Sequence, residues 1–247
     1  MVKWISHRGE SYDAPENTLA AFKLSMERNT GGMECDVHLT TDGKVVVGHD
    51  NSTWRMGSRR MLIESSSYAE LQSVTVSAGF ENVYPGEKIP LLSETFQYLG
   101  AGREYYIELK GSNPELIPAV AEEVKKSGVD PKQIIFIAFN EDMVKGIKQA
   151  MPQCCALWLN SLVREYGIVT PEELVAKLDE LGVDGIDGNC NEAISAELVD
   201  AVHRAGKIFA VWTVDNPWQA KALIDLGVDS VTSNRAALLR DILAQSC

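Results

Sequence analysis

Long apolar runs are absent from this chain of 247 residues. A helix that crosses a membrane needs about 18 or more consecutive apolar residues, and no stretch of the sequence approaches that length. We therefore expect no membrane span. Linkers rich in proline, glycine or serine are also missing. We predict a single domain over residues 1–247, because this length suits one α/β barrel.

Positive charge is scarce as well. The sequence has 23 lysines and arginines against 35 aspartates and glutamates, which gives a net charge of -12. A uniformly acidic protein is repelled by nucleic-acid backbones and by anionic membrane surfaces, so neither is expected as a partner. A small anionic ligand is still compatible with this charge, because a bound metal ion and an arginine can reverse the sign of the field inside a pocket.

The cysteines are few and odd in number, and no C-x-x-C motif occurs. The five are Cys35, Cys154, Cys155, Cys190 and Cys247. This pattern favours buried free thiols over a disulfide framework or a thiolate metal site. Free thiols are typical of a reducing compartment, and the first apolar segment runs into His7 with no signal peptide before it. A cytoplasmic location is the expectation.

Short apolar runs alternate with helical patterns along most of the chain. One helix start is marked by Thr170-Pro171-Glu172-Glu173, in which threonine caps, proline occupies the first turn and Glu173 completes a capping box. The expected strands lie near residues 4, 34, 106, 135, 156, 185, 210 and 230. Eight such β-α units predict a closed TIM (β/α)8 barrel.

The unit after the second strand is irregular. A tight turn at Thr41–Lys44 joins Cys35–Leu39 to Val45–Gly48, which predicts an antiparallel hairpin. Residues from about 51 to 90 have mixed polarity and one short helical pattern at Ser67–Gln72. We interpret this stretch as a small insertion after the second strand of the barrel.

Three carboxylates fall on two neighbouring strands of the predicted barrel. Glu34 and Asp36 are two residues apart in the second strand, so their side chains share one face. Glu108 lies at the end of the third strand. Oxygen ligands of this kind suit Mg²⁺ or Ca²⁺. His38 has the same parity as Asp36 and is a weaker candidate ligand, which we expect beyond the strand end in polar surroundings.

Two histidines follow strand ends near these carboxylates, where barrel enzymes build their active sites. His7 and Arg8 follow the first strand, and His49 follows the hairpin. Imidazoles titrate near neutrality, so one can accept a proton and the other can donate one during cleavage of a phosphodiester. Arg8 and a metal ion would offset charge on the phosphate oxygens.

Four further residues lie at the edge of this predicted site. Glu16 is placed to pair with Arg8 or another cation, and we interpret Glu16 and Asn17 as support for the site. The alternative is an ordinary start of the first helix, which is expected over Glu16–Arg28 with Asn17 or Thr18 as its cap. Trp212 ends the seventh strand, and Phe139 follows the fourth. Each aromatic ring either lines the substrate pocket or fills the core.

Taken together these motifs resemble the glycerophosphodiester phosphodiesterase family, and the resemblance covers essentially the whole chain. The motifs are His7-Arg8-Gly9, Pro15-Glu16-Asn17-Thr18, Glu34-x-Asp36, Thr41-Asp42-Gly43, His49-Asp50, Glu108-x-Lys110 and Trp212-Thr213-Val214. The resemblance implies a TIM barrel that hydrolyses glycerophosphodiesters to sn-glycerol 3-phosphate and an alcohol with a divalent cation.

Residue by residue, the resemblance assigns four roles. His7 and His49 match the general acid/base pair, the three carboxylates match the metal ligands, Arg8 matches the phosphate contact and Lys110 a further polar contact. Two segments depart from the family pattern: Trp54-Arg55-Met56-Gly57 in the insertion, and Thr232-Ser233-Asn234-Arg235 at the eighth strand. The second departure is expected to change contacts near the eighth loop and to leave the catalytic set intact.

Two other functions are compatible with the same motifs. One is a lipid phosphodiesterase of the sphingomyelinase D type, which forms a cyclic phosphate. The other is a non-catalytic barrel that binds a phosphorylated metabolite. The head group, the choice of metal, the nucleophile and the oligomeric state are not determined by the sequence.

Overall fold

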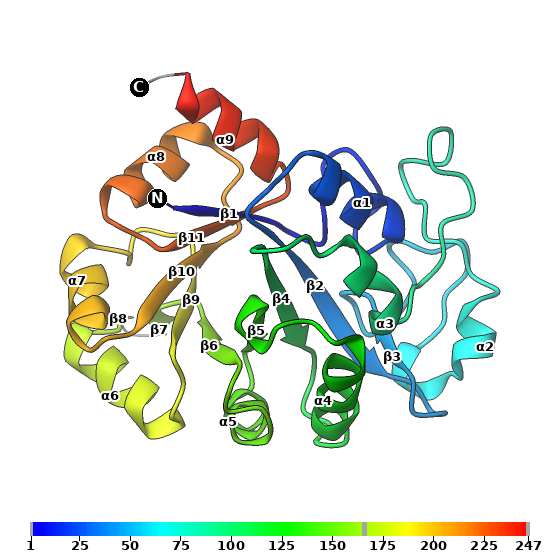
Figure 1. Cartoon of the computed structure of the whole chain (residues 1–247), viewed down its shortest axis with the longest axis horizontal. Helices are drawn as coiled ribbons and strands as arrows, with labels where there is room; N and C mark the ends of the chain where they lie inside the picture. The colour runs from blue at the N-terminus through cyan, green and yellow to red at the C-terminus, as the bar shows by residue number, and fades with distance from the viewer. Residues whose placement is uncertain (1, 165–166, 246–247) are drawn as a thin grey trace.

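The computed structural model describes residues 2–164 and 167–245 and has a closed barrel at its centre (Figure 1). The eight parallel strands of its wall are β1 (Lys3–Ser6), β2 (Gly32–Leu39), β4 (Glu104–Leu109), β5 (Ile134–Ala138), β6 (Cys155–Asn160), β9 (Gly185–Asn189), β10 (Ile208–Trp212) and β11 (Ser230–Ser233). The barrel closes because β1 pairs on one side with β2 and on the other with β11. The predicted TIM barrel is confirmed.

Helices surround the barrel wall (Figure 1). The longer ones are α1 (Leu19–Glu27), α4 (Leu116–Ser127), α5 (Glu141–Ala150), α6 (Pro171–Leu181), α7 (Ala196–Arg204), α8 (Pro217–Asp225) and α9 (Ala236–Ala244). The predicted capping box of α6 is present, with Thr170 and Glu173 each bonded to the other's backbone. Helix α1 begins later than the sequence predicted, because Asn17 has a φ of 58° and Thr18 is the residue that caps the helix.

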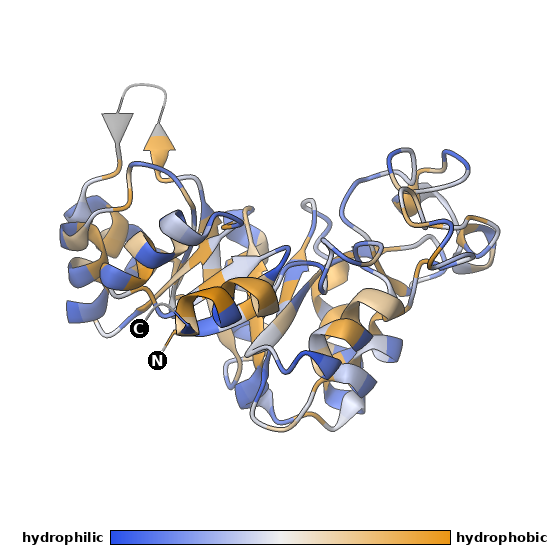
Figure 2. Cartoon of the chain, turned by 90° about the horizontal axis from the view of Figure 1, so that it is seen from above, coloured by the Kyte–Doolittle hydropathy of each residue, from blue (hydrophilic) through white to orange (hydrophobic). Residues whose placement is uncertain are grey.

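The hairpin after β2 is confirmed: β3 (Val45–Val47) pairs antiparallel with the end of β2. The segment that follows contains a 3-10 turn, η1 (Ile63–Ser65), and the short helix α2 (Tyr68–Leu71). It projects from one side of the molecule (Figure 2) and has a small apolar cluster of its own. This cluster comprises Val46, Ile63, Leu71, Val74, Val76 and Ile89.

Several short elements were not predicted from the sequence. They are α3 (Leu92–Thr95), η2 (Phe96–Tyr98), η3 (Pro131–Gln133) and the two-residue strands β7 (Val163–Arg164) and β8 (Gly167–Ile168). None is longer than about one helical turn or one strand pair, so none imposes a detectable hydrophobic period on the sequence.

Two apolar layers stabilise the barrel. The larger lies between strands and helices and includes Cys35 and Cys154. The four cysteines within the described residues are free thiols, as predicted. Cys35 and Cys154 are buried, whereas Cys155 and Cys190 are only partly buried, and Cys247 lies outside that part of the chain. Over the same described residues, none of the helices is long and apolar enough to cross a membrane.

Asp187 is a polar exception inside the barrel. It pairs in register with Leu159 and Ala210, two members of the interior apolar cluster, and it is 1% exposed. Its Oδ1 has no hydrogen-bond partner among the described residues. Burial alone raises the pKa of Asp187 to about 8, because a carboxylate loses its hydration in an apolar interior.

This burial makes stability depend on pH. The unfolded chain releases the Asp187 proton near pH 4, whereas the folded chain holds it up to a pKa of about 8. Between these values the unfolded state binds fewer protons, so Asp187 lowers the free energy of unfolding by about 1.4 kcal/mol for each pH unit gained. Asp187→Asn is expected to be increasingly more stable than wild type from pH 5 to 8. Urea unfolding at several pH values measures this difference, and a difference that stays constant with pH contradicts the prediction.

Candidate active site

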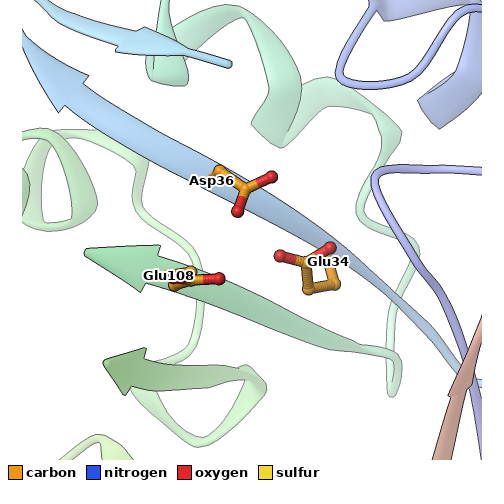
Figure 3. Close-up of side chains that lie close together, drawn as sticks. All are labelled: Glu34, Asp36 and Glu108. Atoms are coloured by element: carbon orange, nitrogen blue, oxygen red, sulfur yellow. The ribbon is translucent and has the colours of Figure 1, made fainter. Parts of the chain in front are cut away.

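The three predicted metal ligands meet at the carboxyl ends of β2 and β4. Glu34 and Asp36 point from β2 toward Glu108 on β4 (Figure 3). One oxygen from each residue lies within 4.8 Å of the others, and all three side chains are buried. The alternation of side chains along β2 produces this arrangement, because Cys35 between the two acids turns outward into the core.

Burial and mutual repulsion perturb these carboxyls strongly. Burial and then the charge of Asp36 raise the pKa of Glu34 well above its usual range. The same two causes raise the pKa of Glu108 to about 8. Asp36 behaves in the opposite way, because Arg8 and Lys110 outweigh its burial and hold its pKa well below the usual range. Without a cation the site therefore keeps protons on Glu34 and Glu108.

Two cationic side chains border the carboxylates. The Arg8 Nε lies 3.4 Å from Asp36 Oδ2, and the Arg8 backbone N–H donates to Glu34 Oε2 at 2.8 Å. On the other side, Lys110 Nζ donates to Glu108 Oε1 at 2.8 Å and lies 3.3 Å from Asp36 Oδ1. Arg8 has a φ of 56°, a conformation that non-glycine residues rarely adopt and that tends to persist where function requires it.

Two atoms in this group lack a hydrogen bond although they are buried. They are Asp36 Oδ1 and Arg8 Nε, considered against all described residues. A buried polar atom without a partner is costly, so its presence at a site indicates a missing ligand. A carboxylate oxygen suits a hard cation, and a guanidinium N–H suits a phosphate oxygen. The donor set therefore fits a divalent cation with a phosphate beside it.

His7 is held by a residue from the opposite end of the chain. Its Nδ1 lies 2.7 Å from Asn234 Oδ1. The Asn234 amide is oriented by Asp215, which accepts from both its side-chain and its backbone nitrogens. This orientation assigns the Asn234 oxygen to His7, so that Nδ1 carries the proton and Nε2 is free. Burial, with Arg8 adding to it, lowers the pKa of His7 to about 4, which keeps the ring neutral.

Asn234 corrects an expectation. The departure at Ser233-Asn234 was expected to leave the catalytic set intact, but Asn234 touches the predicted catalytic His7 directly. The physical reason is closure of the barrel, because β1 pairs with β11 and His7 is therefore next to the end of the last strand. Asp215 was also missed, although it follows the Trp212-Thr213-Val214 motif immediately.

We expect Asn234→Ala to lower kcat by about 10- to 100-fold, the usual cost of losing a partner that orients a functional histidine. The fold should be retained, because the change removes a short side chain at a loop. Steady-state kinetics together with the thermal unfolding temperature test this. Asn191→Ala, which removes an amide that bonds Ser161 outside the site, is the control. Equal effects of the two variants would contradict a special role for Asn234.

His49 also has its ring held by a neighbouring oxygen, in this case that of a carboxylate. Its Nδ1 lies 2.7 Å from Asp50 Oδ1. Asp50 in turn accepts a hydrogen bond from Arg55 Nε at 2.8 Å. Burial lowers the pKa of His49, although the charge of Asp36 opposes this effect. The two predicted catalytic imidazoles thus each have Nδ1 bonded to a neighbouring oxygen, which leaves Nε2 for chemistry.

Glu16 and Asn17 both contact residues of the site. Glu16 accepts from Arg8 Nη1 at 2.8 Å and also from Arg55. Asn17 Nδ2 donates to Asp36 Oδ2 at 2.8 Å. The second of the two alternatives for Asn17, a helix cap, does not hold, because Thr18 fills that position.

Phe139 and Trp212 form an aromatic pair, with ring centroids 5.5 Å apart and planes nearly perpendicular. Phe139 is exposed, and the Trp212 indole N–H donates to the backbone oxygen of Asp187 at 3.1 Å. Trp212 is therefore tied to the interior of β9, while Phe139 presents an edge to solvent. Their predicted contact with substrate stays a prediction.

His38 is not placed as expected. It lies inside β2, fully buried, and not beyond the strand end. Its Nδ1 lies 3.1 Å from Glu64 Oε1, and its Nε2 lies 3.3 Å from the backbone oxygen of His49. It is absent from the carboxylate group that can hold a metal. The antiparallel pairing with β3 extends β2 past Val37 and buries His38.

Both the sequence and the fold of this chain are similar to those of known proteins. Residues 7–238 match the model of the glycerophosphoryl diester phosphodiesterase family. The chain is 28% identical over 234 residues to a glycerophosphodiester phosphodiesterase of Caldanaerobacter subterraneus, which covers 93% of each chain. It is similar to the structure of an Oleispira antarctica phosphodiesterase in complex with the product sn-glycerol-3-phosphate, with a TM-score of 0.88, 25% identity and coverage of 97% and 96%. A glycerophosphodiester phosphodiesterase structure from Thermotoga maritima gives a TM-score of 0.78, 25% identity and 98% coverage of both chains. From the barrel, its acidic site and these likenesses, the chain belongs to the glycerophosphoryl diester phosphodiesterase family and is an enzyme of that family.

Proposed function

We propose that this protein hydrolyses glycerophosphodiesters to sn-glycerol 3-phosphate and an alcohol, with a divalent cation and with His7 and His49 as the acid/base pair. The observation that carries the proposal is the set of three buried carboxylates, within 4.8 Å of one another. His7 Nε2 lies 4.0 Å from one of them, Glu34, and Arg8 beside them has an Nε that makes no hydrogen bond. The product bound in the Oleispira antarctica phosphodiesterase supports the same reaction.

Glu34, Asp36 and Glu108 would hold the cation, which is Mg²⁺ or Ca²⁺ because every ligand is an oxygen. A bound cation supplies charge to the phosphate oxygens and lowers the barrier to attack at phosphorus. Arg8 contributes a second positive charge, aimed by its ion pairs with Glu16 and Asp36. Lys110 binds Glu108 and Asp36 and limits the net negative charge that the phosphate meets.

The two histidines move the protons. With Nδ1 protonated toward Asn234, the Nε2 of His7 carries a lone pair and can accept the proton of the attacking hydroxyl. Asp50 lies beside the Nδ1 of His49 and stabilises the charged form of that ring. His49 therefore donates a proton to the departing alkoxide. Trp212 and Phe139 border the substrate on the side of β5 and β10.

The test is a coupled assay for released glycerol 3-phosphate, with glycerophosphocholine and glycerophosphoethanolamine as substrates and with Mg²⁺ or Ca²⁺ added. We expect cation-dependent release. Phosphorus NMR of the products separates hydrolysis from cyclisation, and a cyclic phosphate as end product would favour a reaction of the sphingomyelinase D type. Tight binding of glycerol 3-phosphate without turnover of any diester would leave only a binding role and would overturn the proposal.

A further inference from the structure

Arg55 is the one arginine of the 51–90 segment that reaches the site. Its fork donates to both oxygens of Glu16 at 2.7 Å, through Nη1 and Nη2. Its remaining nitrogen, Nε, donates to Asp50 Oδ2 at 2.8 Å. Arg55 thus connects two carboxylates that are 34 positions apart in the sequence.

Each of these carboxylates holds a residue of the proposed chemistry. Asp50 bonds the Nδ1 of His49 at 2.7 Å, and Glu16 bonds Arg8 Nη1 at 2.8 Å. The result is one continuous chain of charged contacts from His49 through Asp50, Arg55 and Glu16 to Arg8. Planar bidentate contacts between guanidinium and carboxylate fix orientation as well as distance.

The loop that carries Arg55 has a constrained backbone. Thr53 is buried, and its backbone and side chain both bond Met61. Gly57 leaves no room for a side chain, since an added Cβ would lie 2.6 Å from the Thr53 backbone oxygen. Below this loop lies the apolar cluster that includes Ile63 and Val76. These contacts constrain the backbone on both sides of Arg55.

An ordinary ion pair does not account for this arrangement. The side chain of Arg55 is 43% exposed, and exposed ion pairs contribute little to stability. Arg55 instead holds Glu16 by a bidentate fork and Asp50 by its Nε, and these two acids contact Arg8 and His49. Such an arrangement suits precise positioning, because small misplacements of reacting groups slow a reaction strongly.

We propose that Arg55 is a positioning residue, which aligns His49 through Asp50 and Arg8 through Glu16, so that the insertion after the second strand completes the active site. This inference rests on the proposed function. Arg55 is expected to affect kcat through the positions of His49 and Arg8, without touching the substrate itself.

The experiment measures kcat and KM for glycerophosphocholine hydrolysis by wild type, Arg55→Ala, Arg55→Lys and Arg60→Ala. Arg60 is the matched control, because it lies in the same loop and only approaches the Trp54 ring, at 6.0 Å. We expect Arg55→Ala to lower kcat by about 10- to 100-fold with a much smaller change in KM, and Arg60→Ala to behave as wild type. Arg55→Lys should fall between them, since an ammonium keeps the charge but cannot bond both carboxylates in the fork geometry.

Rescue by free guanidinium separates positioning from folding. A cleft is lined by Glu16, Asp50 and Arg55, and removal of the arginine side chain leaves space in it for a guanidinium ion. Millimolar guanidinium should restore part of the kcat of Arg55→Ala and none of that of His49→Ala. An Arg55→Ala enzyme with kcat within about twofold of wild type, or a defect that guanidinium leaves unchanged in a folded variant, overturns the inference.

Two further outcomes are decisive. If Arg55→Ala does not fold, a folded Arg55→Lys with reduced kcat supports the inference, and one with full kcat overturns it. In the double variant Asp50→Asn/Arg55→Ala, the combined loss should be smaller than the sum of the two single losses, because Arg55 acts on His49 through Asp50. Failure of the proposed function is recognised separately, since wild type would then release no glycerol 3-phosphate before any variant is compared.

Discussion

His7→Ala and His49→Ala are each expected to lower kcat by about 10²- to 10⁴-fold, the usual contribution of a positioned general acid or base. Both rings have Nδ1 committed to a neighbouring oxygen, on Asn234 or Asp50, and both leave Nε2 for the substrate. The double variant should be little worse than either single one, because a base without its acid partner contributes little. Stopped assays of glycerol 3-phosphate release measure the loss.

His203→Ala is the control for these variants. His203 lies on α7, outside the carboxyl ends of the strands, and its Nε2 contacts Asp229 at 3.0 Å. Its kcat should equal that of wild type. If His7→Ala or His49→Ala kept more than about a tenth of the wild-type kcat with an intact fold, the two-imidazole scheme would be wrong.

Removal of the cation should lower turnover at least as much as loss of either histidine. EDTA is expected to abolish turnover, and Mg²⁺ or Ca²⁺ should restore it. In the cation-free protein burial and the charge of Asp36 raise the pKa of Glu108 to about 8, so at pH 7 this group holds a proton that a cation must displace. Cation affinity should therefore rise from pH 6 to pH 8 and level off at higher pH.

Titration calorimetry in buffers of different ionisation enthalpy measures the released protons directly. Asp36→Asn should weaken cation binding by more than about tenfold, since a lost ligand costs at least as much as a lost outer contact. Full activity after dialysis against EDTA, or cation binding without proton release at pH 7, would contradict the prediction.

The sequence alone predicted those parts of the structure that depend on local pattern. Strand ends, helix caps such as Thr170, and the shared face of Glu34 and Asp36 follow from periods of two and 3.6 residues. The contacts of Asn234 and Arg55 could not be found in this way. Asn234 meets His7 across 227 positions and Arg55 meets Glu16 across 39, and only closure of the barrel and folding of the insertion bring them together.

For His38 the local pattern was read correctly, but the position predicted from it was wrong. It shares the parity of Asp36, but the strand pairing continues past Val37 and uses its imidazole to hold the backbone of His49. A side chain that satisfies buried neighbours and one that binds a ligand have the same sequence signature. Their difference lies in the tertiary contacts.

The pairing of β1 with β11 has a consequence for the order in which the site is completed during synthesis of the chain. While the ribosome makes the chain, all three acidic residues of the cluster have been synthesised by residue 108, but the amide that orients His7 is 126 positions further on. The residues of the cation site therefore exist in the nascent chain long before the catalytic histidine has its partner. Activity begins only when the last strand joins the first.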